Sequence, residues 1–170
     1  MRLLGLDPGL RRTGWGAIDW DGTRLRYVAS GDIRPDPDQP LAARLVELHD
    51  GLRRVIETWR PDSAAVEETF VNVNPASTLK LGQARGVVLL TPALAGLPVA
   101  EYHNREIKKS VVGTGRATKQ QVAMMVRALL PGSRPDSEDA ADALAVAICH
   151  AHHGDAARRR ALMSVAEGAS

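Results

Sequence analysis

Cysteine and long apolar runs are scarce in this chain of 170 residues, and each shortage excludes a class of protein. The one cysteine, Cys149, allows neither an internal disulfide nor a cysteine-based zinc site. No apolar run approaches the ~18 residues of a membrane span, and no basic-then-apolar leader is present. We therefore expect a cytoplasmic protein with no membrane association.

The composition that remains is that of one globular domain. Hydrophobic residues make up 44% and charged residues 25%, which suffices for a sizeable core. From residue 154 onward the chain is rich in Ala, Gly and Ser and carries three consecutive arginines at 158–160. We expect a domain over 1–153 and a flexible C-terminal tail over 154–170.

Charge is unevenly distributed, although the formal net charge is only +2. Residues 101–130 hold six Lys or Arg against two Glu, whereas residues 131–150 hold one Arg against four acids. A basic segment beside an acidic one suits an enzyme that holds a polyanion together with metal ions. It equally suits a solvated surface with ion pairs.

The chain opens with a short apolar run, Leu3–Leu6, that delivers Asp7 and then stops in a Pro8-Gly9 turn. The pattern predicts a strand buried on both faces, with Asp7 at its tip. Residues 13–18 and 25–31 read as two further strands, so an antiparallel meander is expected.

A second apolar run ends in an acid as the first one does. Leucines and other apolar residues recur at helical spacing over about 40–59, and residues 64–67 then read as a strand ending in Glu67. A right-handed crossover would place this strand parallel to the first, with Glu67 near Asp7. Because Glu68 faces the opposite side, we choose Glu67 as the inward acid.

The middle of the chain predicts a long helix over 75–95, begun by Asn74-Pro75. Gly82 and Gly86 lie on one face of this helix and allow another backbone to approach closely. That backbone would belong either to a second subunit or to the chain's own sheet. Pro92 should kink or end the helix. A strand over 97–100 and helices over 104–111 and 118–130 follow.

The last helix is expected over 136–153, with Ser137 as a candidate cap. Asp139 and Asp142 are three residues apart and so share one face of this otherwise apolar helix. A helix N-terminus favours acids, and a bound cation would also offset the cost of burying them. Together with Asp7 and Glu67 they form a set of oxygen ligands suited to Mg²⁺, with room for two ions about 4 Å apart.

These motifs together resemble the RuvC family of bacterial Holliday-junction resolvases. The resemblance lies in LGLDPGLRRTGWG at 4–16, Val66-Glu67 followed by Phe70, LKLGQARGV at 79–87, VVG at 111–113 and DAADALAVA at 139–147. It implies an α/β, ribonuclease H-like fold with a five-stranded mixed sheet flanked by helices. It also implies a homodimer that resolves four-way DNA junctions by paired nicks in recombination and repair, with a branch-migration motor complex of RuvA and RuvB as its partner.

The resemblance also implies roles for single residues. Asp7, Glu67, Asp139 and Asp142 match the catalytic acids, which would hold two Mg²⁺ ions, with Mn²⁺ able to substitute, for two-metal-ion phosphodiester hydrolysis. Lys119 matches a basic residue at the scissile phosphate, and Lys108 another near the DNA; Arg116 lies in the same basic segment. Phe70, the single phenylalanine, matches an aromatic that stacks on a base.

Three other functions share parts of this pattern. An actin-like ATPase or sugar kinase has a similar first loop but needs a second phosphate loop and usually a duplicated domain. A ribonuclease H-like nuclease for another substrate would cut, for example, an RNA–DNA hybrid. A non-catalytic DNA-binding module would not need four intact acids. His103 and His150 are expected to be structural rather than metal ligands, and Cys149 a buried apolar residue.

Overall fold

The computed structural model describes residues 1–68 and 74–167, and from residue 155 onward it describes the backbone alone. Its five strands are β1 (Arg2–Asp7), β2 (Thr13–Trp20), β3 (Leu25–Ile33), β4 (Ser63–Glu68) and β5 (Val99–His103). Its helices are α1 (Leu41–Trp59), α2 (Pro75–Leu94), α3 (Asn104–Val112), α4 (Lys119–Leu129) and α5 (Glu138–Glu167).

The strands form one mixed sheet in the order β3-β2-β1-β4-β5, which confirms the predicted five-stranded α/β architecture. β1, β2 and β3 are the expected antiparallel meander, and β4 lies parallel to β1 with Leu6 opposite Val66. The crossover through α1 therefore brings Asp7 and Glu67 to the same end of neighbouring strands, as predicted.

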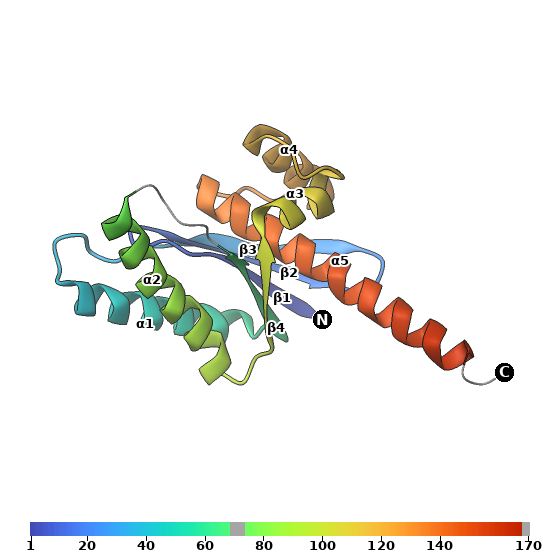
Figure 1. Cartoon of the computed structure of the whole chain (residues 1–170), viewed down its shortest axis with the longest axis horizontal. Coiled ribbons are helices and arrows are strands. Elements are labelled where there is room, and N and C mark those ends of the chain that lie inside the picture. The colour runs from blue at the N-terminus through green and yellow to red at the C-terminus, as the bar shows by residue number, and fades with distance from the viewer. Residues whose placement is uncertain (69–73, 168–170) are drawn as a thin grey trace.

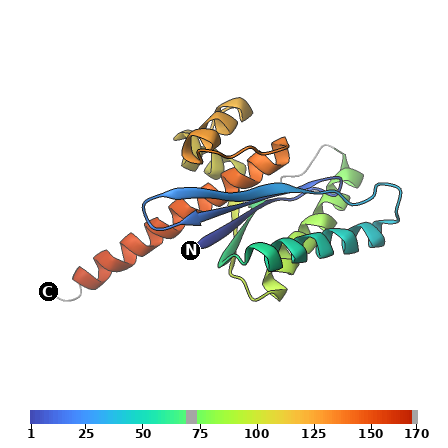
Figure 2. The same cartoon turned by 180° about the vertical axis from the view of Figure 1, so that it is seen from behind.

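Helices cover both faces of the sheet (Figures 1 and 2). α1 and α2 lie on one face, while α5 runs across the other with α3 and α4 packed over it. β1 contributes to both layers, since Leu4 and Leu6 pack toward α1 and α2 and Leu3 packs toward α5. All three leucines are buried, so the prediction of a strand buried on both faces is confirmed.

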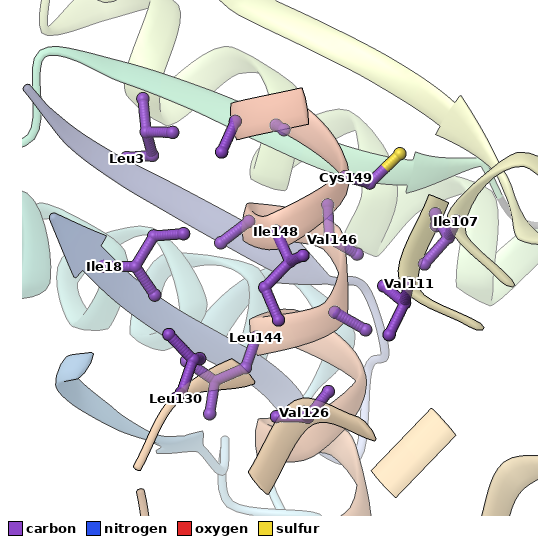
Figure 3. Packing of buried hydrophobic residues seen from close by; sticks show 14 of the residues in the cluster. Leu3, Ile18, Ile107, Val111, Val126, Leu130, Leu144, Val146, Ile148 and Cys149 are labelled. Atoms are coloured by element: carbon purple, nitrogen blue, oxygen red, sulfur yellow. The ribbon is translucent and has the colours of Figure 1, made fainter. Parts of the chain in front are cut away.

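α5 lies unusually close to the sheet because glycines face it. A Cβ placed on Gly5 would lie 2.0 Å from the Ala143 carbonyl oxygen, and one on Gly14 would lie 2.1 Å from the Asp139 carbonyl oxygen. Apolar side chains fill the rest of this layer, with Leu144 and Ile148 of α5 at its centre (Figure 3). The glycines thus set the distance between the sheet and the helix that carries two of the acids.

Side chains cap three of the helices. Asn74 accepts hydrogen bonds from the backbone amides of Ala76 and Ser77, and Thr118 forms a reciprocal capping box with Gln121 at the start of α4. Ser137 Oγ accepts from the Ala140 amide at 3.0 Å, which confirms it as the cap of α5.

Two predicted boundaries are wrong. α5 continues to Glu167 rather than ending near 153, because the Ala- and Arg-rich stretch that follows has good helix propensity. β5 occupies Val99–His103 rather than 97–100, because Pro98 has no amide hydrogen for the strand ladder. Pro92 lies inside the last turn of α2, which ends at Leu94. None of the described helices is both long enough and apolar enough to cross a bilayer.

Candidate active site

Two of the candidate acids stand at the ends of the central parallel strands. Asp7 closes β1, and Glu67 follows Val66 in β4, the residue paired with Leu6. Glu67 accepts a hydrogen bond from the Asn104 side-chain amide at 2.7 Å, whereas its neighbour Glu68 pairs with His103. The strand alternation that predicted Glu67 as the inward acid therefore agrees with their partners.

The other two acids come from the first turns of α5. Gly14 is paired with Asp7 in the β1–β2 ladder. The backbone of Asp139 also packs directly against Gly14. Asp142 follows one turn later on the same side of the helix. Segments more than 130 residues apart in the sequence thus meet at one end of the sheet.

Burial beside three other carboxylates raises the pKa of Asp7 to about 8. Burial is the largest cause, and the negative charges of Glu67, Asp142 and Asp139 add to it. The Lys119 ammonium acts in the opposite direction. The repulsion among these acids therefore acts most clearly on Asp7, whose carboxylate is the most difficult to ionise.

Burial also raises the pKa values of Glu67 and Asp142, in each case against a partner that lowers them. For Glu67 that partner is Asn104, and for Asp142 it is Lys119, whose Nζ lies 3.4 Å from Asp142 Oδ2. The same contact raises the pKa of Lys119. The lysine thus neutralises one acid of the cluster and stays charged.

The donor set fits hard divalent cations, since all four acids offer carboxylate oxygens and bear mutual repulsion that a cation would relieve. Within the described residues, however, no three His, Cys, Asp or Glu side chains already converge as a complete ligand set. Resident partners hold the carboxylates instead: Asn104 on Glu67, Lys119 on Asp142, and Arg12 on Asp139 at 3.4 Å.

The predicted DNA-contacting residues lie on the α3–α4 side of the acids. Lys108 in α3 is close enough to Glu67 to lower its pKa, and it lines a hollow together with Asn104. Arg116 is exposed in the loop before α4, and Lys119 is the first residue of α4. Phe70, the predicted stacking residue, lies outside the described residues.

A second basic surface, on the opposite side of the acids, was not predicted. It is a hollow lined by Arg11 and Arg12 of the β1–β2 loop, Arg34 after β3, Arg44 of α1 and Lys80 of α2, and Asp139 borders it. We call this surface the basic hollow. Its cations are scattered along the sequence, so no local charge cluster revealed them. Asn104 was also missed, although its position directly after β5 places it beside the end of β4.

The histidines and the cysteine have other surroundings. His150 Nε2 lies 2.9 Å from Ser63 Oγ and its Nδ1 lies 2.9 Å from the Tyr102 hydroxyl, and burial lowers the pKa of this imidazole. Cys149 is buried in the layer beneath α3 and burial raises its pKa to about 12, which confirms the predicted apolar role.

A mixed sheet that gathers four carboxylates at one end, between two basic surfaces, defines a nuclease of the ribonuclease H-like class. The particular family is shown by comparison with known proteins. The chain belongs to the RuvC family of crossover junction endodeoxyribonucleases, whose family model matches residues 3–150. It is 70% identical to the RuvC of Paramagnetospirillum magneticum over 90% of this chain and 92% of that one. It is 61% identical to the RuvC of Rhodospirillum rubrum over 99% of both chains.

Solved structures agree with this assignment. Thermus thermophilus RuvC in complex with a Holliday-junction substrate superposes with a TM-score of 0.86 at 33% identity, covering 92% of this chain and 96% of that one. The yeast mitochondrial Holliday-junction resolvase Ydc2 shares the fold, with a TM-score of 0.65 at 12% identity, over 88% of this chain and 77% of that one. The predicted family and the ribonuclease H-like fold are therefore confirmed.

Proposed function

We propose that the chain resolves four-way DNA junctions by hydrolysing one phosphodiester bond at each acid cluster of a homodimer, in homologous recombination and DNA repair. The observation that carries this proposal is the convergence of Asp7, Glu67, Asp139 and Asp142, registered in the raised pKa of Asp7. Family membership supports the substrate.

The four acids are the proposed ligands of two Mg²⁺ ions per subunit, with Mn²⁺ able to replace Mg²⁺. The ions would supply an activated water and stabilise the charge on the leaving oxygen. The chain's own contribution is to hold the carboxylates in position. Asn104 fixes the Glu67 carboxylate by its hydrogen bond, and the Gly14 contact fixes the start of α5.

Lys119 is the proposed electrostatic partner of the scissile phosphate. Its Nζ is already within 3.4 Å of Asp142, and the side chain is 70% exposed. An exposed pair of this kind contributes little to stability, so the ammonium can turn toward an incoming phosphate at small cost. There it would act as a point charge that stabilises the developing negative charge.

DNA affinity would come from both basic surfaces beside the acids. Lys108, Arg116 and Lys119 lie on the α3–α4 side and the basic hollow borders Asp139, so a strand lying across the acids would meet cations from both. Phe70, adjacent in sequence to the end of β4, is proposed to stack on a base at the junction.

The proposed subunit contact is one face of α2. Leu79, Leu90 and Leu94 are exposed on this helix at 66%, 54% and 69%, although they are large apolar residues. Among the described atoms, nothing lies within 4 Å of a Cβ placed on Gly82 or Gly86. The alternative that these glycines bring α2 against its own sheet is therefore wrong, and a second copy of the chain is the proposed occupant. Two clusters related by a two-fold axis would match two symmetric cuts.

Action in the cytoplasm and loading by the RuvA and RuvB motor proteins complete the proposal, and both rest on the family assignment. In this setting the dimer would receive its junction from a branch-migration complex.

Separating binding from cleavage tests the proposed site. Changing Asp7, Glu67, Asp139 or Asp142 to its amide should abolish cleavage while leaving junction binding largely intact, because affinity comes mainly from contacts to phosphates. Double variants should lose no more activity than single ones, since losing one ligand already disables the site. A Glu57→Gln variant, altered at an exposed acid of α1 that pairs with Arg53, is the control and should cut normally.

A further inference from the structure

We propose that Arg12 is a resident counter-ion of Asp139 that competes with the divalent cation, and that Asp32 receives its guanidinium when the cation binds. This inference rests on the proposed role of Asp139 as a metal ligand. It concerns two residues to which the proposed cleavage mechanism gives no task of their own.

One guanidinium contacts both carboxylates. Arg12 Nη1 lies 3.4 Å from Asp139 Oδ2, and Arg12 Nε lies 3.9 Å from Asp32 Oδ2. The Arg12 side chain is 41% exposed, so its end can move at little packing cost. Arg12 therefore already stands between an acid of the proposed metal site and an acid outside it.

The backbone that carries Arg12 is held firmly, which limits the movement to the side chain. A Cβ on Gly9 would lie 2.2 Å from the Arg12 carbonyl oxygen, so the loop folds back tightly on itself. The Thr13 hydroxyl closes the turn by donating to the Gly9 carbonyl at 2.7 Å, and Thr13 is fully buried. The guanidinium therefore moves about a fixed attachment point, on an arc that includes both acids.

Asp32 is a fixed acceptor at the other end of that arc. Its carboxylate is only 5% exposed, and it accepts hydrogen bonds from Ser137 Oγ at 2.6 Å and from Arg34 at 2.9 Å. These partners hold the Asp32 carboxylate in place whether or not Arg12 is near. Ser137 is also the cap of α5, so the acceptor is tied to the helix that carries Asp139.

The arrangement makes metal binding an exchange of cations at Asp139. Without a divalent ion, Arg12 offsets the charge of a carboxylate that belongs to a repelling cluster. A divalent ion that takes Asp139 as a ligand displaces the guanidinium, and Asp32 offers it a second carboxylate nearby. Asp32 is thus a positioning residue, which acts on the metal site through Arg12.

Mn²⁺ binding by the full chain without DNA tests this exchange, with the free Mn²⁺ followed by electron paramagnetic resonance. Arg12→Gln should tighten Mn²⁺ binding by about two- to five-fold, the range expected for the loss of an exposed ion pair. Arg12→Lys keeps the charge and should stay close to wild type. Arg53→Gln is the matched control, since Arg53 is also an exposed arginine between two acids but lies on α1, and it should change nothing.

The role of Asp32 is tested by the double variant. Asp32→Asn should weaken Mn²⁺ binding in the wild-type background, because the guanidinium then has only Asp139, but should have no effect once Arg12 is glutamine. An equal effect in both backgrounds would show that Asp32 acts through Ser137 and α5, and would overturn the exchange. Unchanged affinity in Arg12→Gln would overturn it too and leave the proposed function standing. A wild-type chain that binds no Mn²⁺ would refute the proposed metal site itself.

Discussion

At the scale of single residues, the pKa of the Asp7 carboxyl group depends on the charges of the other three acids of the site. Its pKa is raised to about 8 by burial and by its three acidic neighbours. A raised carboxyl pKa means that the folded state binds the proton more tightly than the unfolded chain does, so stability falls as pH rises from about 4 toward 8. This loss should appear in metal-free buffer.

Asp7→Asn removes the charge and should therefore stabilise the metal-free protein at pH 7 to 8 by on the order of 2 kcal/mol. The gain should shrink as pH is lowered toward 4 and vanish well below it, where the wild-type carboxyl is protonated in both states. Adding Mg²⁺ should stabilise the wild type and not the variant. Thermal unfolding across this pH range, with and without Mg²⁺, measures each effect, and a gain independent of pH would contradict the assigned cause.

Lys119 allows a second test at this scale. If its ammonium stabilises charge at the scissile phosphate, Lys119→Ala should lower the single-turnover rate at saturating protein roughly ten- to a hundred-fold. Thermal stability should hardly change, because its pair with Asp142 is exposed. Lys109→Ala, on an exposed residue of the same basic segment, serves as the control. A Lys119→Ala loss that disappears at high protein concentration would instead mean a role in binding alone.

At the scale of elements, the position of α5 decides whether the acids meet. Gly14→Ala would drive a methyl group into the Asp139 backbone, where no flexible side chain can yield. We expect a stability loss of about 1–3 kcal/mol and a loss of cleavage even at temperatures where the variant is folded. Gly154→Ala, a glycine of α5 with open space around it, should leave both the fold and the α5 position unchanged. Chemical denaturation and junction cleavage of the two variants make the comparison.

Local patterns are what made most of the elements predictable. Two apolar runs end in Asp7 and Glu67, and a helical pattern lies between them. This arrangement predicts two parallel neighbouring strands, and it therefore predicts that the two acids lie close together. The exact approach of α5 was not predictable, since it depends on Gly5 and Gly14 meeting a backbone more than 120 residues away. The sequence drew attention to Gly82 and Gly86, which face open space in the described structure.

The ion pairs of the site were equally hidden. Arg12, Asp32 and Ser137 stand in three separate segments with no shared motif, and only the fold brings them together. The same holds for the basic hollow, whose cations come from a loop, a strand end and two helices. Charge counting along the chain revealed only the α3–α4 surface, because its basic residues are close in sequence.

At the scale of the whole molecule, the exposed apolar face of α2 predicts a dimer. Sedimentation should show twice the 18.3 kDa chain mass. A Cβ on Gly86 meets nothing within 4 Å in the described subunit, so we expect Gly86→Leu to leave the fold intact while blocking close approach of a second α2. The variant should sediment as a monomer and nick single strands without resolving junctions. A variant that remains a dimer would place the subunit contact elsewhere.

The central claim is that one set of four acids in each of two subunits makes paired cuts in junction DNA. The most direct measurement compares a synthetic four-way junction with a matched linear duplex and an RNA–DNA hybrid, each strand labelled, in Mg²⁺ and in chelator. We predict symmetric nicks in two opposing strands of the junction, in Mg²⁺ only, and none in the other substrates; Asp139→Asn should still bind the junction but not cut it. Equal cutting of the duplex or the hybrid, or near wild-type cutting by Asp139→Asn, would contradict the account.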